Sequence, residues 1–199
     1  MTYLFIMWVY FQSCQRHPSV NDVVTANCSI EVLPYSTYDQ DNPCTPKTGY
    51  VKLNGVSVWR ASRCGYTPGR RGVNILLIDP FRCSKQESRR FDTHISSDAS
   101  AQLGDYLRLM NHGQVIVGVT ADEPTRKLSS ALSTLRQFGV NVGDVQYRGS
   151  FGFVVQKGFP EKTVLRKAVT EAESHANQPH FIATITGRLQ HTSLSACDC

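Results

Sequence analysis

Residues 73–79 read VNILLID, and this almost unbroken apolar run decides the class of fold. A strand with one solvated face alternates apolar and polar residues, whereas a continuous apolar run is typical of a strand buried on both faces. The run ends in a turn at Asp79-Pro80, and residues 88–93 (SRRFDT) are expected to return as a second strand. Residues 115–119 (VIVGV) are predicted to form another central strand, and residues 151–155 (FGFVV) the last strand of this region. The sequence therefore predicts a sheet whose central strands are covered on both faces.

Two helices are predicted between these strands. The first covers residues 96–111, where Ser96 or Ser97 can cap the exposed N–H groups of the first turn. The second is expected to begin at Glu123-Pro124, because proline is tolerated in a first turn, and to end at Gly139. Their apolar residues recur at helical spacing: Ala99, Leu103, Tyr106, Leu107 and Met110 in the first, and Leu128, Ala131, Leu132, Leu135 and Phe138 in the second.

The segments before and after this region, residues 15–59 and 159–199, have weaker periodicity. Two short alternating runs, at residues 50–53 and 56–59, are joined by Asn54-Gly55 and predict a β-hairpin, since Asn-Gly suits a type I′ turn. Residues 15–47 are rich in Ser, Thr, Asn, Asp and Pro and are expected to form an irregular arm. In the C-terminal extension, residues 159–199, periodicity predicts a third helix over residues 162–173 and an edge strand over residues 181–186.

The N-terminus carries a localisation signal. Residues 3–11 (YLFIMWVYF) form a continuous apolar run that is too short to span a bilayer, which takes about 20 residues. Its length suits the apolar core of a signal peptide, and a polar zone follows at Gln12-Ser13-Cys14. We therefore predict a signal peptide over residues 1–14 and a secreted protein without a stable membrane span. The alternatives are a first β-strand or a misassigned start codon, because residues 1 and 2 carry no positive charge.

The cysteines favour the same compartment. The chain has seven, and cleavage after Cys14 would leave the even number expected of a disulfide framework. The candidates for bridges are Cys28, Cys44, Cys64, Cys83, Cys197 and Cys199. Their connectivity cannot be read from sequence. Cys64 and Cys83 flank one strand and could meet, Cys28 and Cys44 would order the arm, and the two C-terminal cysteines could tether the chain end to it.

The charges and motifs exclude several classes of function. The formal net charge is +5, but the basic residues are dispersed, whereas nucleic-acid binders concentrate them among aromatic residues. Neither a glycine-rich phosphate loop nor a Gly-x-Ser-x-Gly elbow is present, and the cysteines and histidines lack the spacing of a zinc site. Asp79, Asp92 and Asp122 could be considered as the paired carboxylates of a glycosidase, but each has a structural explanation. They stand at a turn, at a strand end and at an expected helix cap, respectively. We therefore expect no catalytic residues, no metal and no cofactor.

The order of short motifs along the chain resembles the ILEI/PANDER domain. The motifs begin with Gly69-Arg70-Arg71-Gly72-Val73-Asn74, and each of the others follows in the order of that family. They are Arg90-Phe91-Asp92-Thr93, Asn111-His112-Gly113-Gln114-Val115-Ile116, Asp122-Glu123, Phe138-Gly139, residues 147–153 (YRGSFGF) and Lys157-Gly158. The resemblance covers residues 48–158. Such domains occur in pancreatic-derived-factor-like secreted cytokines, in the stem region of protein O-mannose N-acetylglucosaminyltransferase and in cell-surface hyaluronidase-type proteins.

The resemblance implies a fold and a function. The implied fold is a single globular β-β-α domain of the α+β class, with two sheets flanked by helices and an N-terminal arm tethered by disulfides. The implied functions are binding of a glycan or glycoprotein, or signalling as a cytokine-like ligand of a cell-surface receptor. A third implied function is that of an accessory module in a polysaccharide hydrolase.

The resemblance also implies particular binding residues. In the transferase stem domain an aspartate and an arginine grip a sugar, and these map onto Asp122 and Arg148. A carboxylate and a guanidinium together offer acceptors and forked donors to sugar hydroxyls. Tyr147 and Phe151 would add an apolar surface for the ring. Many family members have an aspartate and a tryptophan where this chain has Gly149 and Phe151. The alternative is structural, with Asp122 capping a helix and Arg148 pairing with it.

Overall fold

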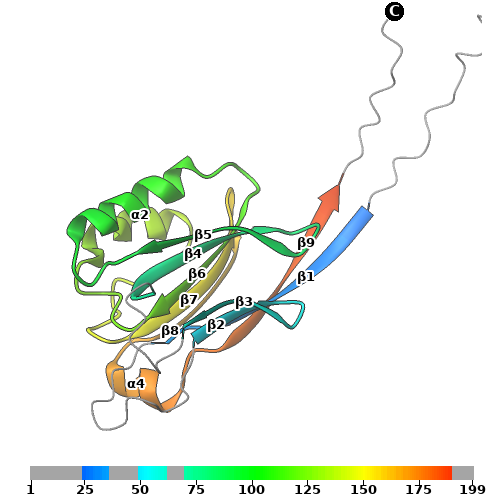
Figure 1. The fold of residues 1–199 in the computed structure, drawn as a ribbon. Helices are drawn as coiled ribbons and strands as arrows, with labels where there is room; N and C mark the ends of the chain where they lie inside the picture. Colours follow the sequence, from blue (N-terminus) through cyan, green and yellow to red (C-terminus); the bar gives the residue numbers. More distant parts are fainter. Residues whose placement is uncertain (1–23, 36–48, 62–69, 190–199) are drawn as a thin grey trace, which may run out of the picture. The chain divides into compact units, whose positions relative to one another are not determined.

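The apolar runs build two antiparallel β-sheets in a computed structural model that describes residues 24–35, 49–61 and 70–189 (Figure 1). The five-stranded sheet has the order β5-β4-β6-β7-β8, with β4 at Gly72–Asp79, β5 at Ser84–Phe91, β6 at Val115–Ala121, β7 at Ser150–Gln156 and β8 at Phe159–Ala168. The four-stranded sheet has the order β3-β2-β1-β9, with β1 at Val24–Leu33, β2 at Gly49–Leu53, β3 at Val56–Ala61 and β9 at Phe181–Leu189. The helical elements are α2 (Ser97–Leu109), the 3₁₀ turn η1 (Leu128–Ala131), α3 (Leu132–Gln137) and α4 (Glu171–Ala176).

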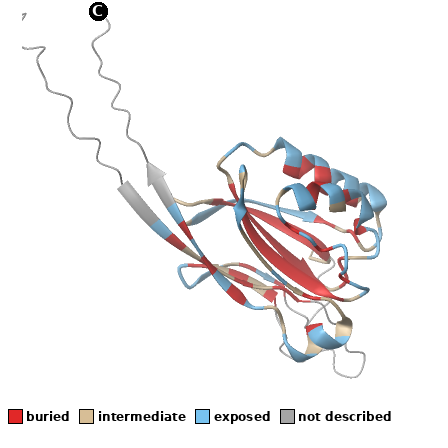
Figure 2. Cartoon of the chain, turned by 180° about the vertical axis from the view of Figure 1, so that it is seen from behind, coloured by how far each residue is buried: buried red, intermediate tan, exposed pale blue. Residues whose placement is uncertain are grey.

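The three central strands of the five-stranded sheet, β4, β6 and β7, are buried on both faces, as their sequence predicts (Figure 2). Leu76 pairs with Val117 across β4 and β6, and both point into a core shared with the four-stranded sheet. Their neighbours Ile75 and Ile116 point the other way, into a second core. That second core is closed by residues of α2, η1 and α3, namely Leu103, Leu107, Leu128, Ala131 and Leu135. Each fully buried aliphatic side chain contributes about 1.5–3 kcal/mol, so both covering layers are needed.

The α+β class with two antiparallel sheets is therefore confirmed, and the helical contribution is modest. α2, η1 and α3 cover only one face of one sheet, while α4 is a single short helix between β8 and β9. The predicted first helix is confirmed as α2, whose N-cap Ser96 accepts a hydrogen bond of 3.2 Å from the Ala99 N–H. The second helix does not begin at Glu123-Pro124 but at Leu128, because the Glu123 side chain binds the backbone of the preceding loop.

The predicted hairpin is confirmed as β2 and β3. Asn54 and Gly55 have φ values of 46° and 82°, which is the paired left-handed geometry of a type I′ turn. The backbone N–H of Asn54 donates to the Ser29 carbonyl, and its side-chain oxygen accepts from the Ser29 N–H, both at 2.9 Å. The turn is thereby fastened to β1.

The irregular arm predicted for residues 15–47 is wrong over residues 24–33, which form β1. Cys28, Ile30 and Val32 point inward, and the polar residues between them point outward. This strand pairs with β2, with Val32 opposite Val51. The polar residues that indicated an arm are the solvated face of an amphipathic strand.

The third helix predicted for residues 162–173 is also wrong. Residues up to Ala168 belong to β8, and α4 begins only at Glu171. A two-residue turn at Lys157-Gly158 folds β8 back on β7, with Gln156 opposite Phe159 and a φ of 90° at Gly158. The apolar spacing of residues 164–169 fits a helix or a strand, and pairing with β7 decides between them. The edge strand predicted over residues 181–186 is confirmed within β9.

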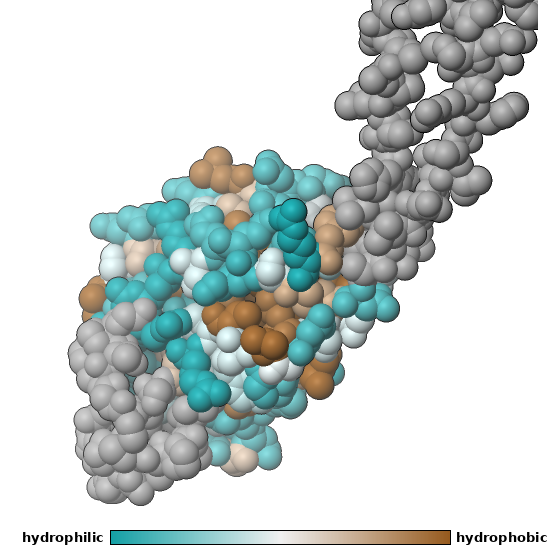
Figure 3. Space-filling model, turned by 45° about the vertical axis from the view of Figure 1, so that its right-hand side comes forward, coloured by the Kyte–Doolittle hydropathy of each residue, from teal (hydrophilic) through white to brown (hydrophobic). Residues whose placement is uncertain are grey.

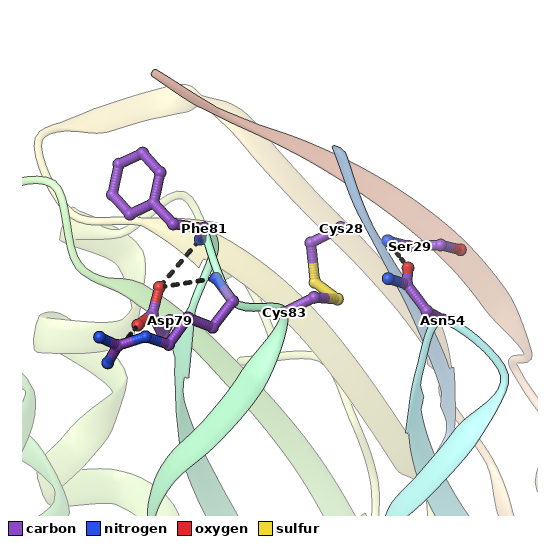
Figure 4. The surroundings of a disulfide bond; sticks show 7 residues. Cys28, Ser29, Asn54, Asp79, Phe81 and Cys83 are labelled. Atoms are coloured by element: carbon purple, nitrogen blue, oxygen red, sulfur yellow. Dashed lines mark hydrogen bonds and ion pairs between the residues drawn. A yellow bond between two sulfur atoms is a disulfide. The ribbon is translucent and has the colours of Figure 1, made fainter. Parts of the chain in front are cut away.

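A disulfide joins Cys28 on β1 to Cys83 in the turn before β5 (Figure 4). It links the two sheets, because β1 belongs to the four-stranded sheet and β5 to the five-stranded one. The turn itself is held by Asp79, whose Oδ1 accepts from the N–H groups of Phe81 at 2.9 Å and Arg82 at 3.1 Å. A bridge between Cys64 and Cys83 is therefore wrong, since Cys83 is already paired. The five other cysteines lie outside the described residues.

The two cysteines are 55 residues apart in sequence, and closing a loop of that length removes about 4 kcal/mol of unfolded-state entropy. We expect the double variant Cys28→Ala/Cys83→Ala to lose up to about that much free energy of unfolding. Urea denaturation under non-reducing conditions measures it. The control Ser84→Ala changes an exposed neighbour and should leave the midpoint in place. An unchanged midpoint in the double variant would contradict a bridge between the sheets.

Candidate functional site

Asp122 and Arg148 lie at the same end of the five-stranded sheet. β6 ends at Ala121 and β7 begins at Ser150, and the two strands are antiparallel neighbours with Val119 opposite Gly152. The residue that follows β6 and the loop that precedes β7 therefore meet at one edge. We call Asp122, Glu123, Tyr147, Arg148 and Glu171, together with the flanking Arg71, Asp92 and His94, the Asp122–Arg148 cluster.

Both central residues have an unusual backbone. Asp122 has a φ of 58° and Arg148 a φ of 59°. In the described part of the chain only two other non-glycine residues have positive φ, and these are Asn54 and Cys83 in turns. A left-handed backbone costs a non-glycine residue on the order of 1–3 kcal/mol and persists only where the surroundings impose it. Such positions gather at ligand-binding sites, which makes this pair the leading candidate.

Glu123 imposes that geometry. Its side chain is 1% exposed, and Oε1 accepts from the Thr125 N–H at 2.8 Å, from the Thr125 hydroxyl at 2.5 Å and from the Arg148 N–H at 3.4 Å. Oε2 accepts from the Arg126 N–H and lies 3.0 Å from His94 Nδ1. Burial by itself raises the pKa of Glu123, but the bonds from Thr125, His94 and Arg126 outweigh it and hold the pKa below the ordinary value. One buried carboxylate thus joins three loops.

Asp122 is in the opposite situation. Its side chain is half-buried, and no hydrogen bond or ion pair joins its carboxylate to any residue that the structure describes. Burial raises its pKa, and the positive charges of Arg71 and Arg148 reduce the rise without cancelling it. The structural alternative for this residue does not hold, because Asp122 caps no helix and Arg148 pairs elsewhere. Its acceptor capacity is unused.

Arg148 is oriented by α4. Its Nη1 donates to Glu171 Oε1 at 3.2 Å, and its Cζ lies 5.5 Å from the centroid of the Tyr147 ring. Glu171 is the first residue of α4, which is held by a capping box between Thr170 and Glu173. A buried hydrogen bond of 2.7 Å between the hydroxyls of Ser150 and Ser174 fastens the helix to β7. The helix therefore sets the direction of the guanidinium.

The flank of the cluster is a forked ion pair. Arg71 Nε and Nη2 donate to the two oxygens of Asp92 at 3.1 and 3.0 Å, and Arg90 lies 3.4 Å from the same carboxylate. Arg71 stands immediately before β4 and Asp92 immediately after β5. The pair closes the end of the sheet next to Asp122 and supplies part of the positive potential there.

Part of the chain is similar to known proteins. Residues 71–159 match the family model described as Interleukin-like EMT inducer. The chain contains an ILEI/PANDER domain. A cell surface hyaluronidase of Danio rerio is 30% identical over 87 residues, which is 42% of this chain and 6% of that protein. The chain therefore matches only a small part of that much longer relative.

Within this ILEI/PANDER domain the structure separates the four predicted binding residues. Asp122, Tyr147 and Arg148 lie in the cluster, and the Tyr147 side chain is 54% exposed. Phe151 is fully buried in the core between the sheet and the helices, so its ring is not offered to a ligand at the surface. The prediction that Phe151 contributes a surface for a sugar ring fails because residues alternate across β7 and this one points inward.

Gly149 explains one departure from the family pattern. A Cβ at this position would lie 2.6 Å from Val145 Cγ1 and 2.6 Å from the Val169 carbonyl oxygen. The aspartate found there in many family members could not be accommodated without moving β8 or the loop. In this ILEI/PANDER domain Asp122 is therefore the acidic residue of the predicted binding pair, and Glu171 supplies a second carboxylate near Arg148.

Sequence reasoning missed three of the residues that build the site. Glu123 adjoins Asp122 in the Asp122-Glu123 motif. Its position before a short polar loop is the one sequence feature that could have indicated a carboxylate binding the loop backbone. His94 follows a motif residue but contacts Glu123 only in the folded chain. Glu171 lies inside the third helix predicted for residues 162–173, and nothing in the sequence indicates its contact with Arg148. Among the residues described, no cluster of three acidic, histidine or cysteine side chains could hold a metal ion. In the same part of the chain, no helix is long and apolar enough to cross a membrane.

The raised pKa of Asp122 predicts a particular pH dependence. An acid whose pKa is raised on folding destabilises the folded state once it ionises, so the penalty is absent below the ordinary pKa of 3.8 and complete above the raised value. We expect Asp122→Asn to increase the free energy of unfolding at pH 7, with a gain that shrinks as the pH falls through the raised pKa.

The matched control for this measurement is Asp98→Asn. Asp98 lies in the first turn of α2, where a negative charge stabilises the helix by about 0.3–1 kcal/mol. The same change of charge should therefore lower stability at pH 7. Denaturant titrations between pH 3 and pH 8 measure both effects. A loss of stability in Asp122→Asn at neutral pH would show that the Asp122 carboxylate has a partner in the fold.

Proposed function

We propose that this chain is an extracellular binding module that recognises a glycan, free or on a glycoprotein, through Asp122 and Arg148. The observation that carries the proposal is the half-buried carboxylate of Asp122, which makes no hydrogen bond or ion pair with any described residue and lies in the positive field of Arg71 and an oriented Arg148. A carboxylate that the fold leaves without hydrogen bonds is available to accept them from a ligand.

The chemistry of the cluster suits sugar hydroxyls. A carboxylate accepts hydrogen bonds from neighbouring hydroxyls, and a guanidinium donates to hydroxyl or ring oxygens. The exposed Tyr147 ring lies beside Arg148 and offers a flat apolar face for the carbon–hydrogen face of a sugar. The left-handed backbone at Asp122 and Arg148 sets the direction in which both side chains leave the chain, and Glu171 holds the Arg148 guanidinium before a ligand arrives, which reduces the entropy lost on binding.

We further propose that the module binds without hydrolysing. Glycosidic cleavage needs a pair of carboxyl groups, one of which keeps a proton near neutral pH through a raised pKa. Asp122 has the raised pKa of such an acid, but Glu123 beside it is 1% exposed and both of its oxygens accept hydrogen bonds from the fold. Glu123 therefore does not reach a substrate or a water molecule as the second carboxylate. The other carboxylates of the cluster, Asp92 and Glu171, are held in ion pairs with Arg71 and Arg148, so Asp122 is left without a catalytic partner.

Two observations support an extracellular location. The Cys28–Cys83 disulfide is of a kind that persists in oxidising compartments. The relative from Danio rerio is named as a cell surface protein. The signal peptide predicted for residues 1–14 belongs to the same proposal and lies outside the described residues.

The exposed apolar side chains favour a glycan over a protein receptor. Figure 3 shows one face that is mainly hydrophilic, with apolar surface at several separate places, the largest of them near the centre. Large exposed apolar side chains in the described residues are Val56, Ile95, Leu109, Tyr147 and Ile182. They come from five separate segments, and only Tyr147 belongs to the cluster. A protein interface of standard size buries about 800 Å² on each partner and centres on clustered anchors.

A glycan array probed with the folded chain tests the proposal, followed by calorimetry on the strongest ligand. Losing a hydrogen bond to a charged group costs about 1.5–3 kcal/mol, so we expect Asp122→Asn and Arg148→Gln each to weaken binding by about 10- to 100-fold. Asp98→Asn removes a charge elsewhere and should bind as the unchanged chain does. Failure to bind any glycan, or equal affinity in all variants, would overturn glycan recognition at this site.

A further inference from the structure

A pocket lies at the other end of β7 from the Asp122–Arg148 cluster. It has a volume of about 220 Å³ and is lined by Arg108, Gln137, Phe138, Gln156, Lys157 and Pro160. Arg108 comes from the last turn of α2, and Gln137 and Phe138 come from the end of α3. Gln156 ends β7, Lys157 lies in the turn that follows, and Pro160 is near the start of β8. A strand advances about 3.4 Å per residue, so the seven residues of β7 place this pocket roughly 20 Å from Arg148. The two sites are separate.

The charge of the pocket is positive. Two of its lining residues are cations, and no carboxylate lines it. Lys157 Nζ donates to the carbonyls of Leu107 at 3.4 Å and Arg108 at 2.5 Å, which offsets the partial negative charge at the end of α2. An ammonium has three N–H donors, so one remains for a ligand. The pocket therefore suits an anion.

The Arg108 guanidinium has donors to spare. Nη1 donates to the Thr134 hydroxyl at 2.7 Å, and Nη2 donates to Asp105 on the outer surface of α2. These contacts use two of five N–H groups and fix the plane of the guanidinium. The ion pair with Asp105 is more than half exposed on both sides, and exposed pairs of this kind contribute little. Arg108 can therefore bind a second oxyanion.

The remaining walls select a ring with hydroxyl groups. Phe138 and Pro160 supply apolar surface, and the Phe138 ring centroid lies 5.7 Å from Lys157 Nζ. The amides of Gln137 and Gln156 each offer a donor and an acceptor, and Gln156 uses only Nε2, at 3.1 Å from the Gly113 carbonyl. A plain aromatic acid would make no hydrogen bond to either amide, whereas sugar hydroxyls can bind to both. The volume lies below the range of about 300–1,000 Å³ of drug-sized ligands and suits one ring.

The pocket is held rigidly. The Gly113 N–H donates to the Lys157 carbonyl at 2.8 Å, and the Lys157 N–H donates to the Gln114 carbonyl at 2.9 Å. Gly158 has a φ of 90° with the His112 ring packed against it, so that a Cβ there would lie 2.1 Å from His112 Nε2. Any other residue here would displace the His112 ring and strain the left-handed backbone of the turn. The lining residues on the turn are therefore positioned in advance of binding.

We propose that this pocket binds a single acidic sugar ring, with its carboxylate or sulfate between Arg108 and Lys157 and its hydroxyls on Gln137 and Gln156. The site does not depend on Asp122 or Arg148. A module with both sites would contact a glycan at two places or bind two different glycans.

The test is a nuclear magnetic resonance titration of the folded chain. The probes are glucuronate and N-acetylglucosamine 6-sulfate, with glucose and N-acetylglucosamine as their neutral counterparts and inorganic sulfate as the bare anion. We expect saturable shifts of the Lys157 and Gly158 amides with the two acidic sugars, at affinities at least tenfold tighter than the neutral sugars or sulfate. Tighter binding of one acidic sugar than the other identifies the preferred anion. Equal binding of neutral sugars, binding of inorganic sulfate as tight as that of the acidic sugars, or no saturable shift with either acidic sugar would overturn the proposal.

Two variants on the same helix sharpen this test. Gln137→Glu places a negative charge in the pocket, and Ser133→Glu adds the same charge on the exposed side of α3. We expect the first to weaken binding of the acidic sugar at least tenfold and the second to leave it unchanged. Arg108→Gln is a second way of removing the charge and should weaken binding equally. Arg148→Gln should have no effect, which distinguishes this site from the Asp122–Arg148 cluster. Unchanged affinity in Gln137→Glu and Arg108→Gln would refute the site.

Discussion

Burial of the central strands of the five-stranded sheet on both faces is the constraint from which the rest of the fold follows. β4, β6 and β7 consist almost wholly of buried residues, so neither face can be left to water. The helices after β5 and β6 cover one face. The other face is covered by the four-stranded sheet, all four strands of which lie outside the span that matches the family model. Ala26–Gly187 accordingly form one compact unit, and the Cys28–Cys83 bridge fastens one sheet to the other within it.

The Asp122–Arg148 cluster arises where this sheet ends. The loops after β6 and before β7 must turn sharply, and both do so with a left-handed residue. Glu123 stabilises the two turns by accepting from backbone N–H groups of both loops, and its lowered pKa reflects those bonds. The cost of the strained backbone is thus met by a neighbouring side chain rather than by Asp122 itself. Glu123 therefore has a structural role, and the Asp122 carboxylate keeps its capacity to accept hydrogen bonds.

Much of this could be predicted from local sequence, and the failures share a cause. The Asn54-Gly55 hairpin, α2 with its Ser96 cap and the buried run of β4 depend on neighbours in sequence, so the pattern alone specified them. β1 and β8 depend on pairing with distant strands, and their polar or helix-like spacing concealed them. Asp122 and Arg148 were found through ordered motifs, whereas the burial of Phe151 and the contact of Glu171 with Arg148 exist only in the folded chain. Local periodicity in the sequence does not reveal which distant segments pair with one another.

The contrast between Asp122 and Glu123 argues that the site is built for a ligand. The two carboxylates are adjacent, yet one is saturated with hydrogen bonds and the other has none among the described residues. If the cluster served the fold alone, an asparagine at position 122 would adopt the same left-handed backbone without the cost of a half-buried charge. Retaining the aspartate at a cost to stability is understandable if something outside the chain donates to it. A hydroxyl-rich ligand would supply those donors, so that binding would relieve the penalty and stabilise the folded module at the same time.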